Sequence, residues 1–249
     1  MSKEWFAEWF DSSYYPILYH QRNDQEAQAF IDAMLAFVQL PPAAKVLDLA
    51  CGRGRHSRQL CEAGLDVTGV DLSPASIADA AESITENHCD HLRFWVHDMR
   101  QGFPVVKQAA IFNLFTSFGY FNDQSVNLQV LHNCYEALDE AGILVIDYFN
   151  TDFVIANLVA THSLAIQDIE FRIHKKVENG LIVKDIHIED GTQTFDFQER
   201  VQAIRHHDFE RMLIRAGFEV FATWGNYTGV AFDLETSARA IVFARKMKP

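Results

Sequence analysis

The sequence has few basic residues, few cysteines and no long apolar run. Lysine and arginine total 21 against 34 aspartate and glutamate residues, which gives a formal net charge of −13. An acidic chain has no sequence-independent attraction for nucleic-acid phosphates or for an anionic membrane surface. We therefore expect neither a nucleic acid nor a membrane as partner.

The four cysteines, at positions 51, 61, 89 and 134, are scattered and form no C-x-x-C pair. Zinc clusters and redox motifs need closely spaced pairs, so we expect reduced thiols and no metal site. No stretch approaches the roughly 18 to 20 apolar residues of a membrane helix. The first fifteen residues mix acids with aromatics, unlike a secretory signal. Together these absences predict a cytoplasmic protein.

Apolar residues follow two periods along the 249-residue chain. Short apolar runs at 45–50, 65–70, 91–96, 109–115 and 142–149 read as buried strands. Between or before them, residues 25–38, 55–63, 73–87 and 125–138 show the spacing or the start signals of helices. Strands that alternate with helices predict βαβ units and a parallel sheet.

The pattern changes after Asn150. Residues 163–204 alternate with period two, and Asn179-Gly180 and Asp190-Gly191 are strong hairpin signals, so three antiparallel strands are expected there. A helix at 208–216 and strands at 218–224 and 238–245 then restore the first pattern. We predict an α/β fold: a Rossmann-like doubly wound sheet, mostly parallel with an antiparallel C-terminal strand, plus a small antiparallel β-insert. The expected boundaries are 1–150 with 205–249 for the main domain and 151–204 for the insert.

One segment indicates a nucleotide site. The first strand ends at Ala50, Gly52 and Gly54 follow, and a helix begins; Asp71 closes the next strand, 19 residues after Gly52. Glycines let a ligand approach the backbone closely, and an acid at the end of the second strand can accept hydrogen bonds from ribose hydroxyls. This arrangement is typical of a nucleotide-binding βαβ unit.

Two features count against a pyrophosphate dinucleotide. The G-x-G-x-x-G fingerprint needs a third glycine, and Ser57 stands there. Asp48 lies inside the strand, two residues before the turn, where a carboxylate would repel a pyrophosphate and suits a ligand with a positive charge. An NAD-dependent oxidoreductase stays an alternative, as does a non-catalytic cofactor-binding or interaction protein.

The segment Asp48–Gly54, DLACGRG, resembles the first motif of class I S-adenosylmethionine-dependent methyltransferases, with Ala50 where the first glycine usually stands. Further matching segments are Val70–Ser73, His97–Met99, Asn113–Tyr120, Ala141–Val145 and Arg215–Phe218. An insert after the fifth strand resembles the small-molecule branch that includes glycine and amino-sugar N-methyltransferases. The resemblance implies S-adenosylmethionine as cofactor and a small-molecule acceptor.

The resemblance also implies roles for single residues. The turn would pack against the methionine part of the cofactor, Asp71 would take the ribose hydroxyls and Asp98 would accept from the adenine amine. The full set of implied cofactor contacts is Asp48, Ala50, Cys51, Gly52, Gly54, Asp71, Leu72, Asp98, Met99, the backbone at Phe115, and Tyr19 and Arg22 from an N-terminal helical lid. Asp48 and Asp71 could instead cap the helices that follow them, and Asp98 could be a turn residue.

The acceptor pocket is expected beneath the β-insert. Its predicted walls are Tyr14, Tyr15, Tyr120 and Phe149, whose rings and hydroxyls suit a small amine. Methyl transfer to a nitrogen or oxygen nucleophile by in-line displacement needs alignment and exclusion of water more than a dedicated group. The sequence therefore names no catalytic residue.

Overall fold

A seven-stranded sheet forms the centre of the computed structural model, which describes residues 4–20, 24–84 and 91–248. Its order is β10-β11-β5-β4-β1-β2-β3. The strands are β1 Lys45–Leu49, β2 Asp66–Asp71, β3 Leu92–Val96, β4 Gln108–Asn113, β5 Leu138–Phe149, β10 Phe218–Trp224 and β11 Arg239–Lys246. Strands β1 to β5 pair in parallel, and β11 is antiparallel to both β5 and β10. This confirms the predicted α/β fold with an antiparallel C-terminal strand.

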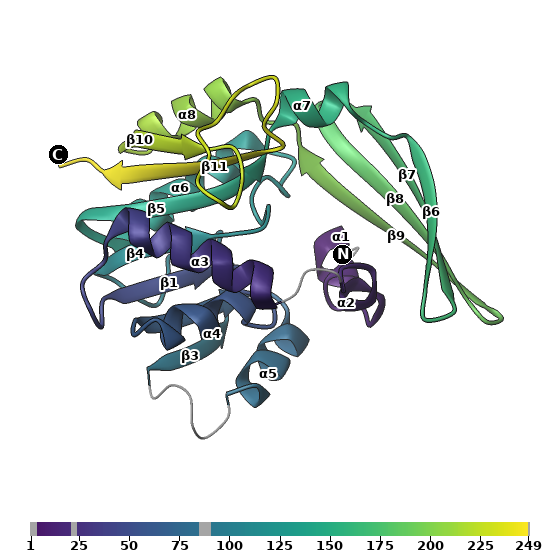
Figure 1. Ribbon diagram of the computed structural model, residues 1–249, viewed down its shortest axis with the longest axis horizontal. Helices are drawn as coiled ribbons and strands as arrows, with labels where there is room; N and C mark the ends of the chain where they lie inside the picture. The colour runs from purple at the N-terminus through teal and green to yellow at the C-terminus, as the bar shows by residue number, and fades with distance from the viewer. Residues whose placement is uncertain (1–3, 21–23, 85–90, 249) are drawn as a thin grey trace.

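Helices cover both faces of this sheet (Figure 1). On one face, α3 (Asp24–Val38) and α4 (Arg55–Glu62) bury Ile31, Met34 and Leu60 against the sheet. On the other face, α6 (Gln124–Ala137) and α8 (His206–Arg215) bury Leu131 and Leu213. Another helix, α5 (Pro74–Glu82), packs on β2 and β3. Because both faces are covered, the central strands β1 and β4 and the second half of β5 are buried over most of their length, as their apolar sequences indicated.

A second sheet follows β5 and the short helix α7 (Thr151–Ala156). Its four antiparallel strands are β6 Thr161–Ile166, β7 Ile169–Glu178, β8 Leu181–Asp190 and β9 Gln193–Gln202. The prediction of three strands was wrong because β6 and β7 are joined through Gln167-Asp168. Both residues have positive φ, 51° and 66°, without a glycine to signal the turn. The Asn179-Gly180 turn and the turn at Gly191 lie where they were predicted.

Two short helices, α1 (Trp5–Trp9) and α2 (Tyr14–Leu18), lie in the angle between the two sheets (Figure 1). We call residues 4–19 the lid. Trp9 is fully buried in a cluster with Phe171 and Ile186 of the second sheet. Its Nε1 and the Tyr19 hydroxyl both donate to Glu199 Oε1 at 2.7 Å. Apolar packing and these bonds hold the lid against the insert.

The thiols differ in part from the expectation. Cys51 and Cys134 are free, whereas Cys61 is in a disulfide bond, so the expectation of four reduced thiols was wrong at Cys61. Within the described part of the chain, no helix is long and apolar enough to cross a membrane.

Asn150 joins the end of β5 to the loop before β11. It is 1% exposed, and its Nδ2 donates to the carbonyls of Leu234 (2.8 Å) and Ser237 (2.9 Å). Replacing it with alanine leaves both carbonyls without this donor. We expect Asn150→Ala to lower the free energy of unfolding by about 2 kcal/mol, measured by urea denaturation.

The matched control is Asn157→Ala, which removes an exposed amide that donates only to the nearby Phe153 carbonyl. It should change the free energy of unfolding by less than about 0.5 kcal/mol. Equal effects of the two substitutions would show that the buried bonds of Asn150 to this loop do not stabilise the fold.

Candidate active site

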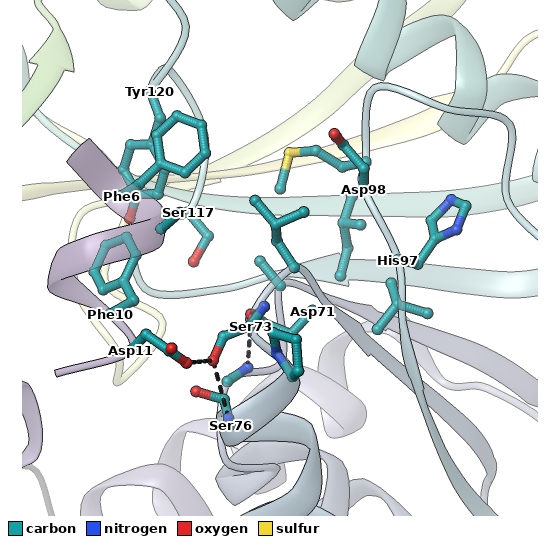
Figure 2. Close-up of a pocket in the computed structure, with 18 of the residues that line it drawn as sticks. Phe6, Phe10, Asp11, Asp71, Ser73, Ser76, His97, Asp98, Ser117 and Tyr120 are labelled. Carbon is teal, nitrogen blue, oxygen red and sulfur yellow. Dashed lines mark hydrogen bonds between the residues drawn. The ribbon is translucent and has the colours of Figure 1, made fainter. Parts of the chain in front are cut away.

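A cavity of about 400 Å³ lies at the carboxyl ends of the parallel strands (Figure 2). Four loops and the lid contribute its walls: Ala50 and Gly52 after β1, Asp71 and Leu72 after β2, Asp98 and Met99 after β3, Phe115, Ser117, Tyr120 and Phe121 after β4, and Phe6, Phe10, Asp11 and Tyr15 from the lid. Strands β2 and β4 lie on opposite sides of β1, so the order of the strands reverses direction at β1. In open α/β sheets such a reversal is where ligands bind.

Asp71 connects two walls of the cavity. Its Oδ2 accepts from the Gly52 amide and its Oδ1 from the Ser73 amide, both at 2.9 Å. Burial raises the pKa of Asp71, although these amide hydrogen bonds act in the opposite direction. The alternative that Asp71 caps α5 does not hold, because the Ser73 hydroxyl caps that helix through the Ser76 amide. Asp71 is therefore a carboxylate held at the cavity wall beside the glycine turn.

The turn after β1 has an unusual backbone. Ala50, Gly52 and Gly54 have φ of 60°, 55° and 76°, in the left-handed region. A Cβ on Gly52 would meet no atom within 4 Å, whereas a Cβ on Gly54 would lie 2.5 Å from the Phe94 ring. Gly54 is thus required by packing behind the turn. Gly52 leaves backbone open for a ligand to approach closely.

Asp48 and Ser57, the two departures from a dinucleotide fingerprint, are partners. The Ser57 hydroxyl donates to Asp48 Oδ2 at 2.5 Å, and both side chains are buried. Alternation along β1 turns Asp48 towards α4, away from the cavity. Burial raises the pKa of Asp48 to about 7, and the negative charge of Asp71 also raises it. The pair joins β1 to the first turn of α4 and supports the glycine turn from behind.

Asp98 lies at the cavity wall and is already engaged. It accepts the Arg100 amide (2.9 Å) and forms a two-pronged pair with the Arg100 guanidinium, whose other side meets Glu4 of the lid at 2.9 and 3.0 Å. Partial burial would raise the pKa of Asp98, but the hydrogen bonds and charge of Arg100 outweigh it and hold the pKa below its usual value. Asp98 therefore stabilises its own turn and also lines the cavity.

Only some of the other predicted residues line the cavity. Tyr15 and Tyr120 line the cavity, together with Ala50, Gly52, Asp71, Leu72, Asp98, Met99 and Phe115. Among the described residues, Asp48, Cys51 and Gly54 do not line the cavity, and Arg22 falls outside the described residues.

Three further predicted wall or contact residues bond elsewhere. The Tyr14 hydroxyl donates to Asp190 at 3.0 Å, Tyr19 bonds to Glu199, and the Phe149 ring stacks on Tyr148 with centroids 4.3 Å apart. Their direct contact with a ligand stays a prediction.

Sequence reasoning missed Phe6, Phe10 and Asp11. Phe6 and Phe10 stand four residues apart, the spacing that places side chains on one face of a helical segment, so periodicity could have identified them. Asp11 Oδ1 accepts from the Ser73 hydroxyl at 2.7 Å (Figure 2). No local signal pointed to Asp11, because the partner lies 62 residues away.

A strand-end acid and a left-handed glycine turn around one cavity define a nucleotide-binding protein of the doubly wound class. A family model described as a methyltransferase domain matches residues 41–208, which is more than half of the chain. The chain therefore belongs to this methyltransferase family and is an S-adenosylmethionine-dependent methyltransferase. This assignment decides against the NAD-dependent oxidoreductase.

Three known proteins illustrate the similarity. A putative methyltransferase, YqeM, of Bacillus subtilis is 26% identical over 241 residues, covering 93% of this chain and 92% of the relative. A glycine/sarcosine N-methyltransferase of Aphanothece halophytica is 26% identical over 85% of this chain and 78% of its own length. A solved structure of S-adenosylmethionine-bound CalS10, an amino pentose methyltransferase from Micromonospora echinaspora, superposes with a TM-score of 0.72 at 18% identity, covering 95% and 98% of the two chains.

The residues of the cavity fit this cofactor. The open space beside the Gly52 backbone and the Asp71 carboxylate are what an adenosyl ligand needs at this edge of the sheet. In the described ranges, no group of three His, Cys, Asp or Glu side chains is arranged to hold a metal ion.

Asp48 should make stability depend on pH. Its folded pKa of about 7 lies above its usual value of 3.8, so unfolding releases a proton between these values and stability falls as pH rises through this window. The loss from about pH 5 to about pH 7 is about 2 to 3 kcal/mol.

Asp48→Asn keeps an oxygen for Ser57 but cannot ionise. The free energy of unfolding of this variant minus that of the wild type should increase from about pH 5 to about pH 7 and level off above. Urea denaturation at several pH values measures this difference. A difference that stays constant with pH would contradict the assignment of a buried, protonated Asp48.

Proposed function

We propose that this enzyme moves a methyl group from S-adenosylmethionine to a nitrogen of a small acceptor by in-line displacement. An oxygen acceptor is the alternative. The observation that carries the proposal is the cavity itself. It joins the Asp71 carboxylate and the open turn at Gly52 to a wall of aromatic rings from the lid and the loop after β4. One end suits an adenosyl group and the other suits a small organic acceptor.

The cofactor would lie along the strand ends. We expect the ribose hydroxyls at Asp71, the adenine ring beside Leu72 and Met99 with its amine towards Asp98, and the methionine part at the turn Ala50–Gly52 and the Phe115 backbone. When bound, the cofactor supplies a methyl group activated by its positively charged sulfur. The chain has to position that group and exclude water.

The lid contributes the exclusion of water. Phe6, Phe10 and Tyr120 pack against one another, with the Phe10 and Tyr120 ring centroids 5.5 Å apart and those of Phe6 and Tyr120 6.2 Å apart. The Tyr120 hydroxyl donates to the Thr116 carbonyl at 2.5 Å, and burial raises its pKa well above the usual value. Tyr120 therefore stays protonated at neutral pH and serves as a wall, not as a general base.

The charges at the cavity favour an amine as acceptor. Among the described residues that line it, Asp11, Asp71 and Asp98 are acidic, and the one arginine, Arg53, is paired with Asp79 at 3.1 Å. The amino group of an acceptor, neutral or protonated, meets no repulsion from these carboxylates. Two of the compared proteins, the glycine/sarcosine and amino pentose methyltransferases, also methylate amines or amine-bearing sugars by name.

The remaining boundaries are part of the proposal. We take residues 1–150 and 205–249 as the cofactor domain with its lid, and 151–204 as an insert beside the acceptor end. The lid contacts both, through Trp9 and Glu199 on one side and Asp11 and Ser73 on the other. A small-molecule substrate, no nucleic-acid or membrane partner and a cytoplasmic location complete the proposal, in line with the net charge of −13.

Calorimetry tests cofactor binding. The wild type should bind S-adenosylhomocysteine and not NAD. Asp71→Asn should weaken S-adenosylhomocysteine binding by about tenfold or more, because an amide is a weaker acceptor than a carboxylate for two ribose hydroxyls. Asp66→Asn is the matched control: Asp66 begins the same strand but pairs with Arg93 on the surface, so this variant should bind like the wild type.

Failure of the wild type to bind S-adenosylhomocysteine would sink the proposed cofactor site, and unchanged binding by Asp71→Asn would sink the role of Asp71. Catalysis itself is tested with a methyl-labelled cofactor and mixed small metabolites. Label should enter amines; its absence from every acceptor would favour a non-catalytic binding protein.

A further inference from the structure

We infer that Asp147, with Arg239 and Tyr227, is a positioning group that holds the loop after β4 in the shape that forms the cavity wall. The inference rests on the proposed function only in taking that wall to be part of the cofactor and acceptor site. The three residues come from β5, β11 and the loop between β10 and β11. Among the described residues none of the three lines the cavity, so each acts on it through the loop.

The loop contains two consecutive strained residues. Phe115 and Thr116 have φ of 72° and 59°. Residues with an aromatic or a β-branched side chain rarely adopt the left-handed region, because that backbone conformation is strained for them. The same loop supplies Phe115, Ser117, Tyr120 and Phe121 to the cavity wall. A relaxed backbone at 115–116 would therefore move that wall.

The bonds that hold this strained backbone converge on Asp147. Its carboxylate Oδ2 accepts the Phe115 amide at 2.9 Å, and its backbone carbonyl accepts the Thr116 amide at 2.9 Å. Asp147, a fully buried residue of β5, thus anchors both strained residues.

Two further residues fix the Asp147 carboxylate. Arg239 donates to Oδ1 through Nε (2.8 Å) and Nη2, and the same Nη2 donates to the Thr116 hydroxyl at 2.8 Å. The Tyr227 hydroxyl donates to Oδ2 at 3.0 Å. The carboxylate therefore has a donor on every side, and its orientation is set independently of any ligand.

The electrostatics also point to positioning. Burial would lower the pKa of Arg239, but the charge and hydrogen bonds of Asp147, together with Tyr227 and Tyr148, outweigh it and the pKa is raised, so the guanidinium stays charged. Desolvation offsets much of the Coulomb attraction in a buried pair, and apolar residues of similar volume often serve stability as well. Stability alone therefore does not explain the buried pair of Asp147 and Arg239. Its effect on the backbone of the two strained residues does.

Tyr227→Phe is the cleanest perturbation. Removing one partner of the buried pair would leave an unpaired buried charge and risks unfolding the protein. Loss of the Tyr227 hydroxyl keeps the pair and removes one bond that orients Oδ2. The Phe115 amide should then exchange its hydrogen about tenfold faster, measured by NMR on the ligand-free protein. This readout needs no cofactor, so it tests the anchoring even if the proposed function fails.

The second readout is affinity for S-adenosylhomocysteine, measured by calorimetry well below the melting temperature. Tyr227→Phe should weaken binding about fivefold, and Thr116→Gly added to it should recover at least half of that loss in free energy. Glycine adopts positive φ without strain, so the loop then needs less anchoring. A merely structural effect of Tyr227→Phe would not be recovered in this way.

The control is Tyr135→Phe, which removes a tyrosine hydroxyl that donates to the Met247 carbonyl at 2.9 Å, at the opposite edge of the sheet. It should alter neither readout. Unchanged exchange at Phe115 in Tyr227→Phe would overturn the anchoring, and weakened binding that Thr116→Gly does not recover would overturn the positioning of the wall. A wild type that fails to bind S-adenosylhomocysteine while Phe115 exchange responds as expected would overturn the proposed function alone.

Discussion

The structure depends on one constraint, the position of β1 between β2 and β4 in a parallel sheet. The loops that leave the carboxyl ends of β1, β2, β3 and β4 must then emerge at one edge. This places the glycine turn, Asp71, Asp98 and the loop at Phe115 around a single cavity, although they span more than 60 residues of sequence. The lid and the second sheet add to this edge but do not create it.

Those parts of the site that depend on local sequence could be predicted. The turn at Gly52 and the acid at Asp71 have fixed places relative to the strands that carry them, and apolar runs identified those strands. Hairpin turns with Asn179-Gly180 and Gly191 were predicted because glycine marks positive φ. The turn at Gln167-Asp168 was not, because its two residues adopt the same backbone region without that mark.

Long-range partners could not be predicted. Asp147 and Arg239 are 92 residues apart, Glu4 and Arg100 are 96 apart, and nothing local indicates either pair. The same holds for the lid: its aromatic block was evident, but the division between Phe6 and Phe10 at the cavity and Trp9 at the insert is set by packing. Asp48 shows the intermediate case, since its unusual position was noticed while its buried partner Ser57 was read only as a missing glycine.

The most direct measurement is a crystal structure of the protein with S-adenosylhomocysteine. We predict the ribose hydroxyls within hydrogen-bond distance of the Asp71 carboxylate, the adenine ring between Leu72 and Met99, and the sulfur facing the rings of Phe10 and Tyr120. A ligand bound elsewhere, or with its ribose away from Asp71, would contradict the central claim that this strand edge is the methyl-transfer site.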